Sequence, residues 1–351
     1  MEQNGSDLQF RILTSSSQAD DKTFVLKHNN TFAVFNRYGD LVPYPKSSLG
    51  IFHEGTRFLS GYGLRVDGDK PLFLSSNLRD RNEMFAVDLT NPDIIADRKI
   101  KLEKGIIHII SRKVLWDSVY YENICFRNFG MEEIEFNIDI SFDADFSDVF
   151  EVRGTERARK GNLLPVSSNS NKILIGYMGT DQTKRTTEIS LDPRPDRLEG
   201  GNAGYLVRLG PGENFIFSVT ISFLISGIER KKVLSFRRAL KSYQRRLEYI
   251  DQHSCWIETS NDQFNHWLGR SRTDLITMIS ETPSGPYPYA GIPWYDNPFG
   301  RDGIITALEC LWMSPEVARG VLRYLAATQA RETDHFRDSE PGKIMHEARN
   351  G

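Results

Sequence analysis

The segment Ile134-Glu-Phe-Asn-Ile-Asp-Ile-Ser-Phe-Asp143 carries an apolar side chain at every second position, with acidic or polar residues between. Successive side chains of a strand point to opposite faces, so this spacing predicts a strand with one buried face and one solvent-facing face. Residues 215–223 repeat the alternation, with Ser218, Thr220 and Ser222 on the polar side. Together the two segments indicate an antiparallel sheet that covers a core with one face.

Short β-rich runs lie on both sides of these segments, separated by turn sequences such as Gly210-Pro211-Gly212. No helical periodicity is visible before about Gly227. Many short strands without intervening helices favour an antiparallel β-sandwich over a parallel sheet. We therefore predict a sandwich domain at 23–226, with long loops at 154–171 and 192–204. The other runs expected to form strands are 31–35, 62–66, 70–75, 106–115, 119–127, 173–178 and 204–209.

The pattern changes to a helical one at about Gly227. Apolar residues recur at spacings of three and four from Val233 to Ile250, which predicts an amphipathic helix at 228–252. Its other face is rich in Lys and Arg. A basic face can bind polyphosphate or a membrane, but the solvated face of a connecting helix fits the pattern better. We interpret 227–257 as a linker helix.

Further helices are predicted after the linker. Asn261-Asp262 is a good capping pair for the first, and Ser314-Pro315 starts another that runs to about Arg331. Since the apolar segment 303–312 immediately precedes Ser314, the last two segments predict a helical hairpin. The side chains expected to face inward are Phe264, Trp267, Leu268, Leu275, Ile276 and Ile279 in the first helix, and Val317, Val321, Leu322, Leu325 and Ala326 in the last.

Length, charge and cysteine content narrow the class of protein. The 351 residues suffice for two domains or one large domain. A net charge of −3 with both signs abundant argues against nucleic acid or anionic lipid as a partner. Cys125, Cys255 and Cys310 lack the spacing of a disulfide framework or a zinc site, which favours a reducing compartment. Residues 1–22 predict a loose polar tail without signal-peptide or membrane-spanning character, so we expect a cytoplasmic protein.

The segment Gly285-Pro-Tyr-Pro-Tyr-Ala-Gly-Ile-Pro-Trp-Tyr-Asp-Asn-Pro-Phe-Gly-Arg-Asp302 predicts a rigid loop. Proline fixes φ and removes backbone donors, so this segment cannot be an ordinary helix or a central strand. Its aromatic faces stand beside Arg301 and Asp302, an arrangement that suits a sugar ring. The aromatic residues of an interdomain loop can equally cover the edge of a core. The residues alone leave both interpretations open.

No common cofactor motif is present. The chain has no phosphate-binding glycine motif and no dinucleotide fingerprint, and the segment around His346-Glu347 lacks the second histidine of a zinc-protease helix. We therefore expect no cofactor and no metal site. Two polar clusters remain, Gly300-Arg301-Asp302 and His346-Glu347-Ala348-Arg349. Their carboxylates can accept sugar hydroxyls and their guanidinium groups can orient those carboxylates, but either cluster can also be a structural ion pair or a helix cap.

Four separated strings resemble, in this order, the amylo-α-1,6-glucosidase family of bacterial glycogen-debranching enzymes. They are GIFHEGTRFLSGYGLRVDG at 50–68, DADFSDVFEVRG at 143–154, AGIPWYDNPFGRDGIITALECLWM at 290–313 and GKIMHEARNG at 342–351. The resemblance covers nearly the whole chain after the tail. It implies a mainly β protein, in which an antiparallel sandwich is followed at 258–351 by the first helices of a glucoamylase-like (α/α)6 toroid.

The resemblance also implies roles for individual residues around a bound sugar. Trp294 and Tyr295 would form the platform, Arg301 and Asp302 would bind the sugar at the cleaved bond, and Glu347 and Arg349 would line the same pocket. Enzymes of this class resemble inverting glycosidases, which use two carboxyl groups about 6.5–9.5 Å apart. Asp302 is the one local candidate for a direct catalytic role, and we expect it to bind substrate rather than donate a proton.

The acid and base of such enzymes are expected beyond Gly351. The prediction is therefore an incomplete toroid and a chain that by itself does not hydrolyse the α-glucosidic linkages, α-1,6 branches in particular, of glycogen-like glucans. Two alternatives remain. The sandwich alone could serve as a non-catalytic carbohydrate-binding or scaffolding module, or the toroid could act on another sugar, as trehalase-type and mannosyl-type enzymes do. In each case the partner is an oligosaccharide or polysaccharide, and the oligomeric state is open.

Overall fold

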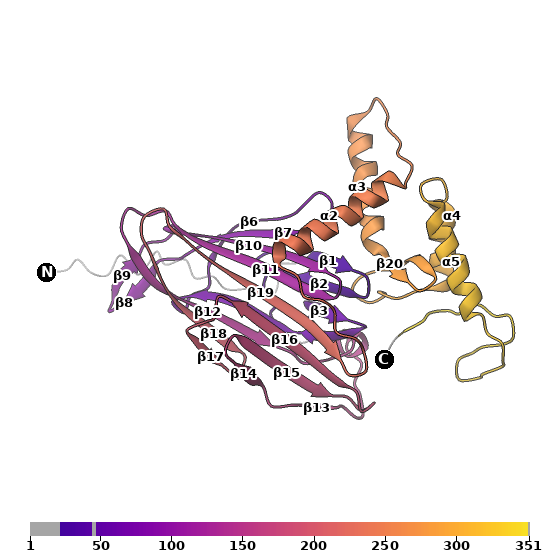
Figure 1. Cartoon of the computed structure of the whole chain (residues 1–351), viewed down its shortest axis with the longest axis horizontal. Helices are drawn as coiled ribbons and strands as arrows, with labels where there is room; N and C mark the ends of the chain where they lie inside the picture. Colours follow the sequence, from indigo (N-terminus) through magenta and orange to yellow (C-terminus); the bar gives the residue numbers. More distant parts are fainter. Residues whose placement is uncertain (1–21, 44–46, 350–351) are drawn as a thin grey trace.

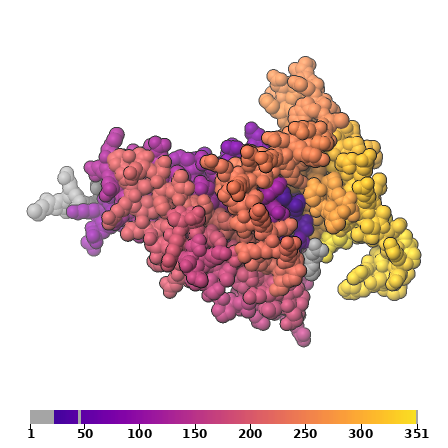
Figure 2. All heavy atoms as spheres, viewed as in Figure 1, coloured from indigo at the N-terminus to yellow at the C-terminus, as the bar shows by residue number. Residues whose placement is uncertain are grey.

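The computed structural model describes residues 22–43 and 47–349 of the chain. Strands fill the chain up to Ile225 and helices dominate after it, which confirms the predicted order of an antiparallel β-sandwich followed by a helical part (Figure 1). In the space-filling view the helical part stands at one end of the sandwich (Figure 2). The predicted tail, residues 1–22, lies outside the described residues except for Lys22.

The largest sheet of the sandwich pairs strands that lie far apart in sequence. Its order is β13-β15-β16-β19-β11-β10-β7-β6, and β14 also pairs with β15, all antiparallel. The last strand of the sandwich, β19, therefore lies inside the sheet between β16 and β11. The strands are β6 (Leu72–Leu78), β7 (Phe85–Thr90), β10 (Ile107–Trp116), β11 (Val119–Asn128), β13 (Asn162–Leu163), β14 (Ser167–Asn169), β15 (Lys172–Met178), β16 (Lys184–Asp192) and β19 (Asn214–Ile225).

Two four-stranded sheets complete the sandwich. One, with the order β17-β18-β12-β5, packs on the large sheet, because the ring of Phe136 lies 5.9 Å from that of Phe126 and the ring of Tyr205 lies 5.0 Å from that of Phe217. The other has the order β1-β2-β3-β4, and a small hairpin, β8–β9, lies far from the helices (Figure 1). Their strands are β1 (Phe24–His28), β2 (Thr31–Phe35), β3 (Gly50–His53), β4 (Thr56–Leu59), β5 (Gly61–Val66), β8 (Ile94–Ala96), β9 (Lys99–Leu102), β12 (Ile134–Asp143), β17 (Arg197–Glu199) and β18 (Asn202–Leu209).

The alternation in β12 divides the strand as predicted. Phe136, Ile138, Ile140 and Phe142 are buried, whereas the polar and acidic residues between them are exposed or half-buried. Because β12 pairs with β18 on one side and β5 on the other, this row of apolar side chains lies in the middle of its sheet. Full burial of a side chain of this size contributes about 1.5–3 kcal/mol, so the alternating row is a main source of the stability of this sheet.

The predicted long loops and the predicted absence of helix before Gly227 are partly wrong. Short strands β13, β14 and β17 form within those loops, and a short helix, α1 (Val149–Arg153), follows β12. The Asp148 side chain accepts hydrogen bonds from the backbone N–H of Phe150 and of Glu151, and the Glu151 side chain accepts from the N–H of Asp148. Elements of two to five residues show no period, so only this capping box marks α1 in the sequence.

The linker helix is shorter than predicted. The helix α2 (Phe236–Gln252) begins at Phe236, and residues 228–235 are not helical. The non-helical segment is fixed to the sandwich instead: Leu234 N–H donates to the Tyr121 hydroxyl at 3.1 Å, and Lys231 pairs with Asp117 at 3.3 Å. Part of the basic residues predicted to be solvated thus bind acidic groups of the sandwich.

The helices α3 and α5 begin at the predicted capping residues, but α5 ends at Thr328 rather than Arg331, and α4 lies three residues earlier than the predicted segment 303–312. Not all of the expected faces are buried. The Asn261 side chain accepts from Phe264 N–H, and Pro315 occupies the first turn of its helix, whereas the Ser314 side chain makes no cap hydrogen bond. Val317, Val321 and Leu325 pack with Ala307 of the preceding helix, which confirms the hairpin. Their bounds are α3 (Asp262–Met278), α4 (Gly300–Glu309) and α5 (Pro315–Thr328).

Four side chains expected to face inward do not. Trp267 is 64% exposed, Leu322 is 64% exposed, and Phe264 and Ala326 are also exposed. In α5 the reason is that the helix packs on α4 and on the strand β21 (Gly285–Pro288) through one face only. In α3 the one buried side chain is Ile276, near the C-terminal end of the helix, and Phe264 and Trp267 lie toward its other end. A helical period marks an apolar stripe without showing what covers it.

None of the described helices is long and apolar enough to span a membrane. The three cysteines are free thiols. Within the described ranges, no group of three or more His, Cys, Asp or Glu side chains is arranged to hold a metal ion.

Candidate functional site

The proline-rich segment begins as a strand and continues as a loop. Its first four residues form β21, which pairs with β20 (Ile279–Thr282) in a two-stranded sheet, so the segment contains no central strand, as predicted; its last three residues, however, are helical. The remainder, residues 289–302, is called the site loop below; it contains a cis peptide bond before Pro293 and ends in the first turn of α4. The fully buried Tyr287 donates its hydroxyl to the Phe299 carbonyl at 2.8 Å and so joins the two ends of the loop. Burial raises the pKa of Tyr287 to about 12, which keeps this donor protonated.

A buried ion pair joins the site loop to the first strand of the sandwich. Lys27 Nζ lies 2.7 Å from Asp296 Oδ1 and 3.0 Å from the Ser280 hydroxyl, and its charge lies 4.7 Å from the ring centroid of Tyr289. The Lys27 and Asp296 side chains are 0% and 6% exposed. Burial lowers the pKa of the Lys27 ammonium and raises the pKa of the Asp296 carboxyl, while their mutual attraction opposes both shifts.

The turn between β1 and β2 reinforces this connection. Tyr289 donates its hydroxyl to the Asn30 side chain at 2.7 Å, and Asn30 donates in turn to the Glu54 carboxylate at 2.8 Å. The Asn29 side chain accepts from Glu281 N–H at 3.2 Å. The site loop is therefore attached to the sandwich through a chain of polar contacts, in addition to the half-buried Trp294, which packs against the sandwich core.

A second segment, residues 343–349, runs along the site loop. Gly300 N–H donates to the His346 carbonyl and Ala348 N–H donates to the Pro298 carbonyl, both at 3.0 Å. The Arg349 guanidinium donates to the Glu347 carboxylate at 3.0 Å and to the Trp294 carbonyl at 3.4 Å. Three of the predicted site residues, Trp294, Glu347 and Arg349, are thus brought together.

The other three predicted residues face solvent. Tyr295 is 42% exposed, its ring lies edge-on to Phe299 at 5.8 Å, and the Arg153 guanidinium lies 5.8 Å from its centroid. Arg301 and Asp302 are exposed in the first turn of α4. Within the part of the chain that the structure describes, neither side chain makes a hydrogen bond or an ion pair. Both are consequently available to a ligand.

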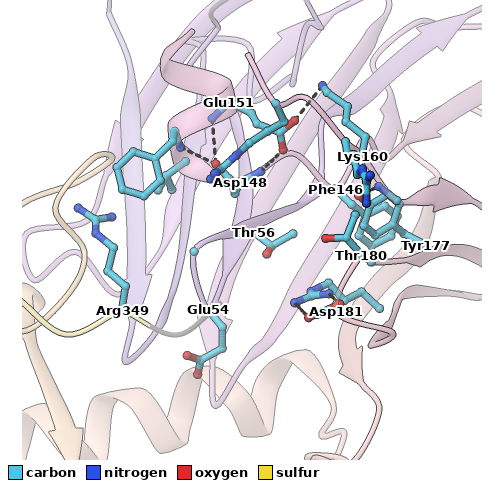
Figure 3. Close-up of a pocket in the computed structure, with 18 of the residues that line it drawn as sticks. Glu54, Thr56, Phe146, Asp148, Glu151, Lys160, Tyr177, Thr180, Asp181 and Arg349 are labelled. Carbon is cyan, nitrogen blue, oxygen red and sulfur yellow. Dashed lines mark hydrogen bonds and ion pairs between the residues drawn. The ribbon is translucent and has the colours of Figure 1, made fainter. Parts of the chain in front are cut away.

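A hollow of about 340 Å³, called the sandwich hollow below, lies beside these loops (Figure 3). All four sequence strings contribute to its walls: Glu54 comes from the first, Asp148 and Glu151 from the second, Asn297 from the third and Arg349 from the fourth. In Figure 3, Arg349 and Asp181 lie on opposite sides, with Thr56 and Asp148 between them. Segments that are far apart in the chain therefore meet at one place.

The sandwich side of this hollow was not predicted from the sequence. Arg157, Lys160 and Arg185 line it from segments interpreted as a loop and an unremarked strand, and the half-buried Tyr177 adds an aromatic face that stacks on Phe146 at 5.4 Å. The one available signal was the concentration of Arg and Lys in the segment 151–160, which a solvated loop explains equally well.

Comparisons with known proteins agree with this architecture. A family model described as the N-terminal domain of (some) glycogen debranching enzymes matches residues 26–220, more than half of the chain. The solved structure called "Putative kojibiose phosphorylase from human microbiome" is similar with a TM-score of 0.58 and 12% identity, covering 86% of this chain and 46% of that one. The chain thus spans less than half the length of that structure, and the likeness is one of fold.

A galactose mutarotase-like protein from Lactobacillus casei ATCC 334 covers 58% of this chain and 100% of its own, at 7% identity and a TM-score of 0.33. No curated protein matches the sequence. The family match extends over the sandwich from β1 to β19, and the fold likeness extends into the helical part. This chain belongs to the carbohydrate-active enzyme family defined by the N-terminal domain of glycogen debranching enzymes.

Proposed function

We propose that the chain provides the sandwich (about 23–226), the linker (227–257) and the first toroid helices (from 258) of a cytoplasmic glycosidase that hydrolyses α-glucosidic bonds of glycogen-like glucans, the α-1,6 branch linkages in particular. The observation that carries the proposal is the convergence of all four family-like strings on one polar hollow beside the site loop. A polar hollow contributes little to the packing of the core, so packing alone does not explain why four separate strings meet there.

The side chains around the site loop suit a sugar. Arg301 and Asp302 are exposed and lack competing partners among the described residues, so a guanidinium and a carboxylate are free to bind hydroxyl groups. Tyr295 offers a partly exposed ring. Glu347 and Arg349 orient each other through their hydrogen bond, and Arg349 lines the sandwich hollow.

The accessible surroundings of Asp302 favour binding over proton transfer. An inverting glycosidase needs a general acid held in a dry environment and a base that activates water, about 6.5–9.5 Å apart. Asp302 is exposed, whereas the buried Asp296 is committed to Lys27. In this proposal Asp302 holds the sugar at the cleaved bond, and neither aspartate is the acid.

The proposal is tested by the Asp302→Asn variant with Glu309→Gln as a matched control, since both are exposed acids on α4. Isothermal titration calorimetry of the full chain with isomaltose and with maltose measures affinity. Loss of a charge-assisted hydrogen bond should weaken binding about tenfold in Asp302→Asn, while Glu309→Gln stays within about twofold. Tighter binding of isomaltose would support the α-1,6 linkage.

Equal affinities of wild type and Asp302→Asn would contradict the assigned site. If saccharide binding persisted in that case, the alternative of a non-catalytic sandwich module would be favoured, because most of the sandwich hollow is lined by sandwich residues. Absence of binding to either sugar would count against a carbohydrate function for this site.

A further inference from the structure

The solvent-facing side of α2 carries a line of positive charges that the proposed function does not use. Arg238, Lys241 and Arg245 are exposed, and the exposed Arg237 lies beside them. Residues three and four apart are neighbours on one face of a helix, so the first three side chains form a line of about 10 Å at 1.5 Å per residue. Arg238, Lys241 and Arg245 are called the cationic row below.

The opposite face of α2 fixes the orientation of the cationic row. Ala239, Tyr243 and Leu247 are buried on that face. Ala239 packs with Val119, and the ring of Tyr243 lies 5.8 Å from that of Trp116, so α2 lies across the connected ends of β10 and β11 (Figure 1). The row is therefore presented to solvent by a helix that is already anchored, and binding has little backbone entropy left to lose.

The acidic groups of the sandwich near α2 pair with other cations. Arg230 and Lys231, which precede the helix, pair with Glu188 and Asp117 respectively. By contrast, within the part of the chain that the structure describes, no side chain of the cationic row makes a hydrogen bond or an ion pair. Its three positive charges are therefore not neutralised within the described fold.

The cationic row does not help α2 to form. Like charges three and four residues apart repel each other, and cations in the first turn oppose the helix dipole. The helices α1, α3, α4 and α5 each have an acidic residue in the first turn, whereas α2 has none. Of the two acids in α2, Asp251 pairs with Arg81 and Arg272, which leaves Glu248 alone to offset the row. Since the row does not stabilise the helix, its charges are available to a partner.

We infer that the cationic row is a docking surface for a short acidic segment of a partner protein. A guanidinium group binds a carboxylate through two parallel hydrogen bonds, and Glu or Asp side chains at helical spacing match a line of three cations. This inference goes beyond the proposed function, because no member of the row lines the sandwich hollow.

Two other anionic partners fit the row less well. A helix that binds a membrane surface inserts its apolar face, but the apolar face of α2 is buried on the sandwich. Nucleic acid binds to extended basic surfaces that contact many phosphates, whereas this row is about 10 Å long and the chain has a net charge of −3.

The test measures the affinity of the full chain for a fluorescein-labelled glutamate peptide of about ten residues, long enough to span the row, by fluorescence anisotropy. The Arg238→Gln/Lys241→Gln/Arg245→Gln variant should lose about tenfold or more in affinity. The matched control is Arg98→Gln/Lys99→Gln/Lys104→Gln, which removes three exposed cations on and beside the β8–β9 hairpin and should stay within about twofold of wild type.

Thermal unfolding separates docking from a structural role. The triple variant of the row should unfold at the same temperature as wild type or higher, because repulsion is removed. The single variant Arg245→Gln, which disturbs no described contact, should lose about threefold in peptide affinity with an unchanged thermal midpoint.

Three results would overturn the inference and leave the proposed sugar site standing. The first is absence of peptide binding by wild type, and the second is an equal loss of affinity in the row variant and the control variant, which would reflect net charge alone. The third is tighter binding of a thymidine oligonucleotide or of phosphatidylserine vesicles than of the peptide, which would assign the row to a phosphate-bearing partner.

Discussion

Replacing Lys27 by methionine removes the ammonium group that attaches the site loop to the first strand and keeps a side chain of similar length. In the native chain Lys27 Nζ is 2.7 Å from Asp296 and 3.0 Å from Ser280. The two ionic side chains are 0% and 6% exposed. The variant therefore leaves the Asp296 carboxylate buried without its counter-ion.

The expected loss follows from this burial. Removing one partner of a buried pair costs about 3–5 kcal/mol, whereas an exposed pair contributes about 0–1 kcal/mol. Burial raises the pKa of Asp296, so a carboxyl left alone can take up a proton, and we expect the lower end, about 3 kcal/mol. The Lys27→Met/Asp296→Leu variant removes both charges and should lie within about 1 kcal/mol of wild type.

Urea denaturation followed by fluorescence measures these free energies. Lys101→Met is the matched control, because Lys101 is 38% exposed in its pair with Asp67 and should lose less than about 1 kcal/mol. Hydrogen exchange of residues 289–300 should accelerate in Lys27→Met and stay unchanged in the control. A Lys27→Met variant no less stable than Lys101→Met would contradict a stabilising role of the buried pair, and so would a double variant as unstable as the single one.

Two further outcomes concern the fold. Burial lowers the pKa of His28 to about 3, so on acidification the unfolded chain takes up a proton before the folded chain does. Lowering the pH from 6.5 to 4.5 should therefore reduce the free energy of unfolding by about 2 kcal/mol. Urea denaturation should show a flatter dependence of this free energy on pH in His28→Phe. Gly320→Ala should cost about 1–3 kcal/mol, because the added Cβ would lie 2.1 Å from the Pro286 carbonyl oxygen, whereas Gly269→Ala, with its nearest neighbour 4.0 Å away, should not lower the thermal midpoint.

The strands were predictable because their signal is local. The alternation of Phe136, Ile138 and Ile140 with polar residues depends only on neighbouring positions, and all three side chains are buried. The order of the strands was not predictable, because the insertion of β19 between β16 and β11 depends on pairing between distant segments. The buried faces of the helices were predictable only in part. The residue spacing showed an apolar stripe that contains Trp267, but the 64% exposure of this side chain depends on what packs against it.

Some features of the candidate site were likewise predictable from the sequence, and others were not. Residue types and turn chemistry alone marked the site loop as a rigid aromatic segment with Arg301 and Asp302 at its end, since proline, glycine and aromatic side chains act through local geometry. Only the tertiary structure decided that Lys27 holds this loop through Asp296, and that Arg157 and Arg349 line the same hollow. Buried ion pairs and shared walls arise where separate elements pack together, and a contact between distant residues leaves no pattern in the spacing of either one.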